Sequence, residues 1–254
     1  MRFKSFGFSD PGKVRSSNED SYLCNEEEGL FFVADGMGGH ASGKTASLTA
    51  IKSIEKFILK SRSENSRWSV KISNKLSLEQ NRLLAAASFG NRVIKKISKY
   101  TPSMKGMGTT LIGGVIEGDN LSVINVGDSR LYRIRDKRIE QLTQDHTLAG
   151  QQERDGTLTR EEARHHPNRN ILTCALGYMK DKSNIDTFLI KIKSKDLYLI
   201  CTDGLYEMLE DDEIFKIIDS TISESLYKAG ISLALNANLA GGRDNITFVL
   251  LSFN

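Results

Sequence analysis

The chain has 254 residues, which is long enough to bury a substantial apolar core. Its composition, 39% hydrophobic and 26% charged, is unlike that of a disordered or fibrous protein. Its 35 basic and 32 acidic residues leave a charge of +3, too small to favour nucleic acid or anionic lipid as a partner. Three widely spaced cysteines without a Cys-x-x-Cys pair argue against a disulfide framework or a thiolate metal site, and indicate a reducing cytoplasm.

The first third of the chain predicts one strand and two helices. Leu30 to Ala34 is a short apolar run that ends in Asp35 and a glycine, the pattern of a buried strand stopped by a turn. From Gly43 to Leu59 apolar residues recur every three or four positions, which predicts a helix, and a second helix is expected from Leu78 to Ile97. The polar segment from Ser61 to Ser77 is expected to be a connecting loop at the surface.

The middle of the chain is typical of short strands joined by tight turns, which predicts an antiparallel meander. The expected strands are Thr109 to Ile116, Leu121 to Val126, Leu131 to Arg135 and Arg138 to Leu142. Further strands are expected at Ile185 to Ile192, Leu197 to Thr202 and Ile246 to Phe253, with a helical region from Asp211 to Ala240. Because strands cluster and helices flank them, we expect an α+β fold with helices packed on antiparallel sheets. No apolar window is long enough for a signal peptide or a membrane helix.

Four aspartates lie at the edges of apolar runs. Asp35, Asp128 and Asp203 each end a predicted strand, and Asp244 precedes the last one. If these strands are neighbours, their carboxylates converge and repel one another unless a hard divalent cation lies between them. We therefore predict a pair of Mg²⁺ or Mn²⁺ ions that share Asp35, with the Gly36 carbonyl approaching them unobstructed by a side chain.

Each of these sites alone is also explained by an ordinary turn, because Asp-Gly is a favoured turn dipeptide. The segment from Arg15 to Asp20 likewise has two interpretations. It is either a solvated charged loop, or Arg15 holds a phosphate through its planar guanidinium while Asp20 orients a metal-bound water. The conjunction of all these segments favours the functional interpretation.

Read together, these segments resemble the metal-dependent protein phosphatase family of the protein phosphatase 2C type, in its bacterial form. The matching segments, in family order, are Arg15 to Asp20, Val33 to His40, Gly106 to Thr110, Val126 to Tyr132, Leu142 to His146, Cys201 to Leu205 and Gly242 to Thr247. They span nearly the whole chain, which we expect to be a single catalytic domain over residues 1–254.

The resemblance implies a central β-sandwich flanked on both sides by helices, and hydrolysis of phosphoserine and phosphothreonine by in-line attack of a metal-bridging hydroxide. It implies that Asp35, Asp203 and Asp244 are ligands of two ions, that the Gly36 carbonyl joins them, and that Asp20 lies in the outer shell. Asp128 together with Asp203 resembles the site of a third, weaker ion. The implied partners are phosphorylated proteins, among them a serine/threonine kinase and its substrates, and we expect a monomer.

One position departs from the family pattern. Many eukaryotic relatives carry a histidine two residues after the first metal-binding aspartate, where this chain has Met37. His40 is the nearest candidate for the general acid that protonates the leaving group, and a metal-bound water is the alternative. His40 is equally explained as a residue that caps or packs the following helix.

The polar segment from Thr147 to Asn170 resembles the flap that lies beside the active site in bacterial members. Its basic residues either steer phosphorylated substrates or belong to a solvated helix followed by a loop. Two rival functions are a catalytically silent member of this fold that binds a partner, and a metal-dependent nuclease. The presence of all four aspartates argues against the first, and the near-neutral charge without an aromatic and basic stripe argues against the second.

Overall fold

Two packed antiparallel sheets form the centre of the molecule in the computed structural model, which describes residues 2–38, 41–63, 72–180 and 185–254. Each sheet has five strands within these ranges. One, named here the β12 sheet, contains in spatial order β1 (Phe3–Asp10), β12 (Ile246–Phe253), β11 (Leu197–Cys201), β8 (Arg130–Arg135) and β9 (Arg138–Gln141). The other, the β7 sheet, contains β10 (Asp186–Lys191), β7 (Asn120–Val126), β6 (Leu111–Glu117), β3 (Leu30–Ala34) and β2 (Ser21–Asn25).

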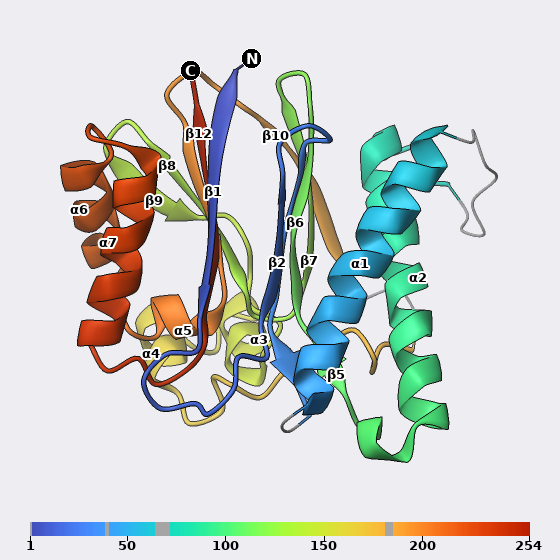
Figure 1. The fold of residues 1–254 in the computed structure, drawn as a ribbon. Coiled ribbons are helices and arrows are strands. Elements are labelled where there is room, and N and C mark those ends of the chain that lie inside the picture. Colours follow the sequence, from blue (N-terminus) through green and yellow to red (C-terminus); the bar gives the residue numbers. More distant parts are fainter. Residues whose placement is uncertain (1, 39–40, 64–71, 181–184) are drawn as a thin grey trace.

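Helices cover the outer face of each sheet, as Figure 1 shows. The helices α1 (Ala41–Ser63) and α2 (Leu78–Tyr100) lie against the β7 sheet, and α6 (Asp211–Thr221) and α7 (Leu226–Leu239) lie against the β12 sheet. The layers therefore run helix, sheet, sheet, helix, which confirms the predicted α+β sandwich.

A strand that is covered on both faces needs apolar side chains on both faces, as β3 illustrates. Because successive side chains of a strand point to opposite faces, Leu30 and Phe32 pack beneath α1 and α2, whereas Phe31 and Val33 enter the core between the sheets. All five residues of β3 are fully buried. This continuous burial explains why the sequence of β3 is an uninterrupted apolar run.

Short elements gather at one end of the sandwich, opposite the two chain termini (Figure 1). They are the two-stranded sheet of β4 (Gly36–Met37) and β5 (Gly108–Thr109), and the helices α3 (Leu148–Arg154), α4 (Arg160–His165) and α5 (Asp203–Tyr206). A 3₁₀ turn at Pro102–Met104 follows α2. None of the helices in the described ranges has the length and apolar character required to cross a membrane.

The predicted meander is wrong. The strands β6 and β7 form one hairpin in the β7 sheet, and β8 and β9 form another in the β12 sheet. The chain changes sheets at Gly127, where the backbone adopts φ +109° and an added Cβ would lie 2.6 Å from the Thr110 side chain. A glycine is required by both the conformation and the space.

The other element predictions differ from the structure mainly at their ends. Both N-terminal helices are longer than expected, and α1 includes the first residues of the predicted loop from Ser61 to Ser77, part of which lies outside the described residues. The helical region from Asp211 to Ala240 is divided into α6 and α7. The edge strands β1 and β2 are not among the predicted elements, although Phe6 and Phe8 of β1 alternate with polar or small residues.

Candidate active site

Four of the five aspartates predicted to act at the metal centre line one pocket, at the end of the sandwich that carries the short elements. Asp35 follows β3, Asp128 follows β7, Asp203 begins α5 directly beyond β11, and Asp244 precedes β12. The pocket has a volume of about 510 Å³, and Gly36 and Arg15 also contribute to its wall. Aspartates beside strands of both sheets therefore meet at one end of the sandwich, as predicted from their positions at the ends of strands.

Asp20 lies behind this pocket and is almost completely buried, with 1% of its surface exposed. Its Oδ2 accepts a hydrogen bond from the Thr202 hydroxyl at 2.9 Å. Burial raises the pKa of Asp20 to about 8, and repulsion from Asp203 and Asp244 adds to the effect. Asp20 is therefore close enough to interact with the pocket carboxylates without forming part of the wall.

Mutual repulsion also raises the pKa values of carboxylates in the pocket wall. Burial, followed by repulsion from Asp20 and Asp203, raises the pKa of Asp35 well above its usual value. Burial and repulsion from Asp244 raise the pKa of Asp203 to about 7. For Asp128 the pKa is raised well above the usual value by burial and by Asp203. A positive charge placed between these groups would relieve the repulsion.

The donor set fits a hard divalent cation. All candidate donors are oxygens, the ligands that Mg²⁺ and Mn²⁺ prefer. The Oδ1 atom of Asp203 is buried and has no hydrogen-bond partner among the described residues, which is costly unless another ligand completes it. Among all the residues that the structure describes, no three Asp, Glu, His or Cys side chains are arranged as they stand to coordinate an ion. The carboxylates would therefore have to turn toward a shared ion when it binds.

Arg15 lies at the mouth of the pocket, in the loop between β1 and β2. Its Nη2 donates a hydrogen bond to Asp244 Oδ2 at 2.5 Å, and 58% of its side chain is exposed. This hydrogen bond and the charge of Asp244 raise the pKa of Arg15 above its usual value. Arg15 lines the pocket and has guanidinium N–H groups beyond the one that Asp244 accepts, so it is suited to receive an oxyanion.

Asn245 and Thr202 support the site but were given no role from the sequence. Asn245 accepts a hydrogen bond from the Glu19 backbone N–H at 2.8 Å and donates to the carbonyls of Pro11 and Ser17 at 3.0 and 2.9 Å. It therefore holds the Arg15 loop against the start of β12. The only signal was its position beside Asp244, since a supporting asparagine has no pattern of its own.

The space around Gly36 requires a glycine, and the role expected for its carbonyl stays a prediction. An added Cβ would lie 2.2 Å from the Gly43 carbonyl oxygen and 2.5 Å from that of Glu19. The close approach is therefore to the start of α1 and to the loop before β2. The pocket wall still includes Gly36.

Backbone hydrogen bonds fix the direction in which the chain leaves β3. The Asp35 N–H donates to the Thr110 hydroxyl at 2.9 Å, and the Thr110 N–H donates to the Asp35 carbonyl at 2.9 Å. The Thr110 hydroxyl is also hydrogen-bonded to the Ser129 hydroxyl at 2.8 Å. Thr110, which interrupts the predicted strand between β5 and β6, therefore links the Asp35 and Asp128 loops.

Two expectations remain predictions. His40 lies outside the described residues, whereas Met37 lines the pocket. The segment from Thr147 to Asn170 contains α3 and α4, and its last residue, Asn170, lines the pocket with Leu172. This segment therefore lies beside the carboxylates.

Comparison with known proteins shows which family and which solved structures this chain resembles. The family model described as Protein phosphatase 2C matches residues 13–240. The serine/threonine phosphatase stp of Listeria monocytogenes serotype 4b (strain F2365) is 34% identical over 96% of this chain and 93% of its own length. The structure of the S. agalactiae serine/threonine phosphatase has a TM-score of 0.85, with 30% identity and complete coverage of both chains. The catalytic domain of the phosphatase PstP, in complex with two manganese ions, has a TM-score of 0.81 and 29% identity, covering 99% of each chain.

Proposed function

Because this chain belongs to the protein phosphatase 2C family, we propose that it hydrolyses phosphoserine and phosphothreonine in proteins, using Mn²⁺ or Mg²⁺ held in the carboxylate pocket. The observation that carries the proposal is the gathering of Asp35, Asp128, Asp203 and Asp244 at one pocket that also includes an exposed arginine. Hydrolysis of a phosphate monoester requires a Lewis acid such as a bound metal ion, and a cationic group that neutralises the phosphate oxygens.

The ligand roles are part of this proposal. Asp35, Asp203 and Asp244 would hold two ions together with the Gly36 carbonyl, and Asp20 would orient water in the outer shell. A third, weaker ion would lie between Asp128 and Asp203, which is consistent with the effect of Asp203 in raising the pKa of Asp128. When bound, such ions lower the pKa of coordinated water and neutralise phosphate oxygens, so that no covalent intermediate with the protein is needed.

The remaining steps are assigned to the chain's own residues. Arg15 would hold the phosphate oxygens through the N–H groups that Asp244 does not use. Asn245 would keep the Arg15 loop in place, since it bonds the backbone on both sides of that residue. His40 stays the candidate for protonating the leaving alkoxide, with water as its alternative.

We also propose that residues 1–254 act as one catalytic domain and that residues 147–170 serve as a flap over its substrate. Support comes from the two sheets, which contribute carboxylates to the same pocket, and from Asn170, which contributes to its wall. Phosphorylated proteins, including the products of a serine/threonine kinase, would be the substrates.

The test is phosphate release from a phosphothreonine peptide by the purified protein, with MnCl₂ or with EDTA. We expect turnover only with metal, and a fall in kcat of at least about 100-fold in Asp203→Ala, because one of the proposed ligands of the ions would be lost. The matched control is Asp219→Ala, which removes an exposed aspartate from α6.

Equal turnover by the two variants would refute the assignment of Asp203. A folded wild-type protein that binds Mn²⁺ but releases no phosphate would instead favour the catalytically silent, partner-binding alternative. Circular dichroism of each variant establishes that the fold is retained.

A further inference from the structure

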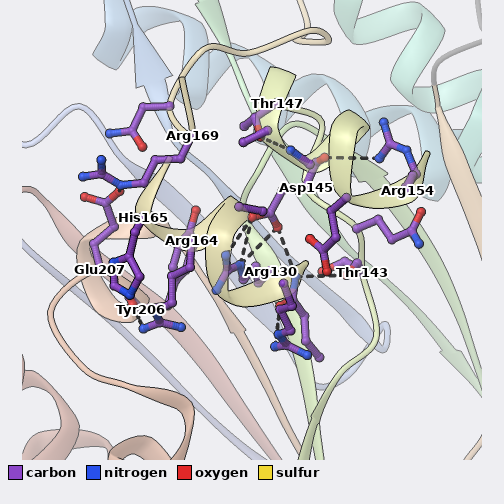
Figure 2. A pocket seen from close by; sticks show the side chains of 18 of the residues that line it. Arg130, Thr143, Asp145, Thr147, Arg154, Arg164, His165, Arg169, Tyr206 and Glu207 are labelled. Atoms are coloured by element: carbon purple, nitrogen blue, oxygen red, sulfur yellow. Dashed lines mark hydrogen bonds and ion pairs between the residues drawn. The ribbon is translucent and has the colours of Figure 1, made fainter. Parts of the chain in front are cut away.

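A second pocket adjoins the first, beneath α3 and α4. It has a volume of about 450 Å³ and is lined by these two helices, the end of β9, α5 and the residues that precede β12. Figure 2 shows its side chains, with Arg154 on one side and Arg169 beside Glu207 on the other. Asn170 lines both pockets, and Arg243 lines this one while the next residue, Asp244, lines the carboxylate pocket. The two pockets therefore share a wall.

The second pocket carries an excess of positive charge. Among the described residues that line it are six arginines and four acidic residues, an excess of two positive charges that falls to one when Asp211, the ion-pair partner of Arg160, is counted. The arginines are Arg130, Arg154, Arg160, Arg164, Arg169 and Arg243, and the acids are Asp145, Glu153, Glu207 and Glu210. Such a surface attracts anions, whereas the neighbouring carboxylate pocket repels them until it holds cations.

Four of the arginines are engaged in ion pairs. Arg130 pairs with Asp145 at 2.7 Å, Arg160 with Asp211 at 2.7 Å, Arg164 with Glu210 at 2.8 Å and Arg169 with Glu207 at 3.3 Å. The Arg130 guanidinium also lies 3.6 Å from the centre of the Tyr206 ring, and the Tyr206 hydroxyl donates to the Asp128 carbonyl at 3.0 Å. These contacts neutralise the charge of four of the six arginines.

The other two arginines that line the pocket are Arg154 and Arg243. Within the described part of the chain, neither Arg154 nor Arg243 forms an ion pair with a carboxylate. Arg154 donates to the Asp145 backbone carbonyl at 3.2 Å (Figure 2), and its charge helps to lower the pKa of Asp186 without forming an ion pair with it. Guanidinium groups that lack a carboxylate partner in a pocket are suited to bind an oxyanion.

We propose that this pocket is a subsite for a second anionic group of the substrate, so that the protein prefers phosphopeptides with an acidic or phosphorylated residue near the phosphate that it removes. The inference rests on the proposed function, whose substrate class it narrows. Consecutive Cα atoms are about 3.8 Å apart, so Arg243 and Asp244 bring the two pockets within a few residues of an extended peptide. A carboxylate and a phosphate offer the same oxyanion chemistry to Arg154 and Arg243.

The test compares phosphothreonine peptides of one length in saturating Mn²⁺. One has glutamine at every flanking position, and the others replace one glutamine at a time with glutamate or a non-hydrolysable phosphonate, from three residues before the phosphothreonine to three after. We expect at least one position to raise kcat/KM by about three- to tenfold, the scale of partly exposed charge-assisted contacts. Comparing the two anions distinguishes a carboxylate subsite from a phosphate subsite.

The ratio of kcat/KM for the anionic and neutral peptides is then measured in Arg154→Gln and Arg243→Gln. Because both peptides meet the same catalytic centre, the ratio cancels any general effect of a substitution on that centre. We expect it to fall toward one in both variants, and to be kept in Arg92→Gln, an exposed arginine of α2 in the opposite helical layer. Unchanged ratios in both pocket variants would overturn the proposal.

Binding of fluorescent versions of the same peptides separates this proposal from the proposed function. Tighter binding of the anionic peptide, lost in the two pocket variants, without phosphate release would refute the phosphatase function and keep the anion subsite. Phosphate release without any preference for the anionic peptide would refute the subsite and keep the phosphatase.

Discussion

At the scale of single residues, Arg15 is held in place by an ion pair and is still accessible from the pocket, two properties that usually compete. Its ion pair with Asp244 restricts the side chain, yet more than half of that side chain remains exposed at the pocket mouth. A guanidinium can do both, because its N–H groups point in several directions within one plane. A lysine ammonium carries the same charge without this planar fork.

Arg15→Lys should therefore lower kcat/KM for a phosphothreonine peptide by about tenfold, mainly through KM, because the charge stays while the two-pronged contact with phosphate is lost. Steady-state kinetics in saturating Mn²⁺ measure both parameters. Arg2→Lys, at the exposed start of the chain, is the matched control. An Arg15→Lys enzyme with unchanged KM and kcat would show that Arg15 does not hold the phosphate.

At the scale of elements, Asp196 links the end of β8 to the turn between β10 and β11. Its carboxylate accepts hydrogen bonds from the Nε and Nη2 of Arg135, each at 2.6 Å, from the Lys193 N–H at 2.8 Å and from the Tyr198 hydroxyl at 2.9 Å. Burial alone would raise the pKa of Asp196, but these hydrogen bonds outweigh it and lower the pKa below its usual value.

A carboxyl group whose pKa is lower in the folded protein stabilises the fold above its unfolded pKa of about 4, and this stabilisation is lost as pH falls through the folded value. Asp196→Asn should reduce the free energy of unfolding by about 2 kcal/mol at pH 7, and by less at pH 3. Urea denaturation at both pH values measures the difference. Asp136→Asn, in the exposed turn between β8 and β9, is the control. An equal loss at pH 7 and pH 3 would contradict the ionic role.

At the scale of the whole molecule, the two sheets bring repelling carboxylates together at one end of the sandwich. Among the residues that the structure describes, three apolar clusters hold the layers together, one between the sheets and one beneath each pair of helices. Two features are unfavourable for folding: the buried Asp20 with its raised pKa, and Asp203 Oδ1, which is buried without a hydrogen-bond partner in the described ranges. The cores therefore offset the cost of gathering these carboxylates in one place.

Asp203→Asn should consequently raise the melting temperature of the metal-free protein, because one of the repelling charges is removed. The same variant should lose most of the stabilisation by Mn²⁺, which for the wild type should be about 2.7 kcal/mol at 100 times Kd. Thermal melts in EDTA and in MnCl₂ measure both effects. If Asp203→Asn gained as much stability from Mn²⁺ as the wild type, Asp203 would not be a ligand.

The sequence by itself determined the fold class and the residue types at the pocket. Continuous apolar runs such as Leu30–Ala34 indicate strands covered on both faces, and an aspartate at the end of such a run is visible without any structure. The edge strand β1 escaped prediction because its pairing with β12, at the other end of the chain, supplies the stabilisation that its own sequence does not indicate.

Only the tertiary structure decided which strands are neighbours. Gly127 sends β7 and β8 to different sheets, where sequence spacing alone predicted one meander. The tertiary structure also places Asn245 against the Arg15 loop. It joins the second pocket, beneath α3 and α4, to the carboxylate pocket through Asn170 and Arg243. These contacts join residues far apart in the chain, and their energies depend on burial and on neighbouring charges, which exist only once the sheets have packed.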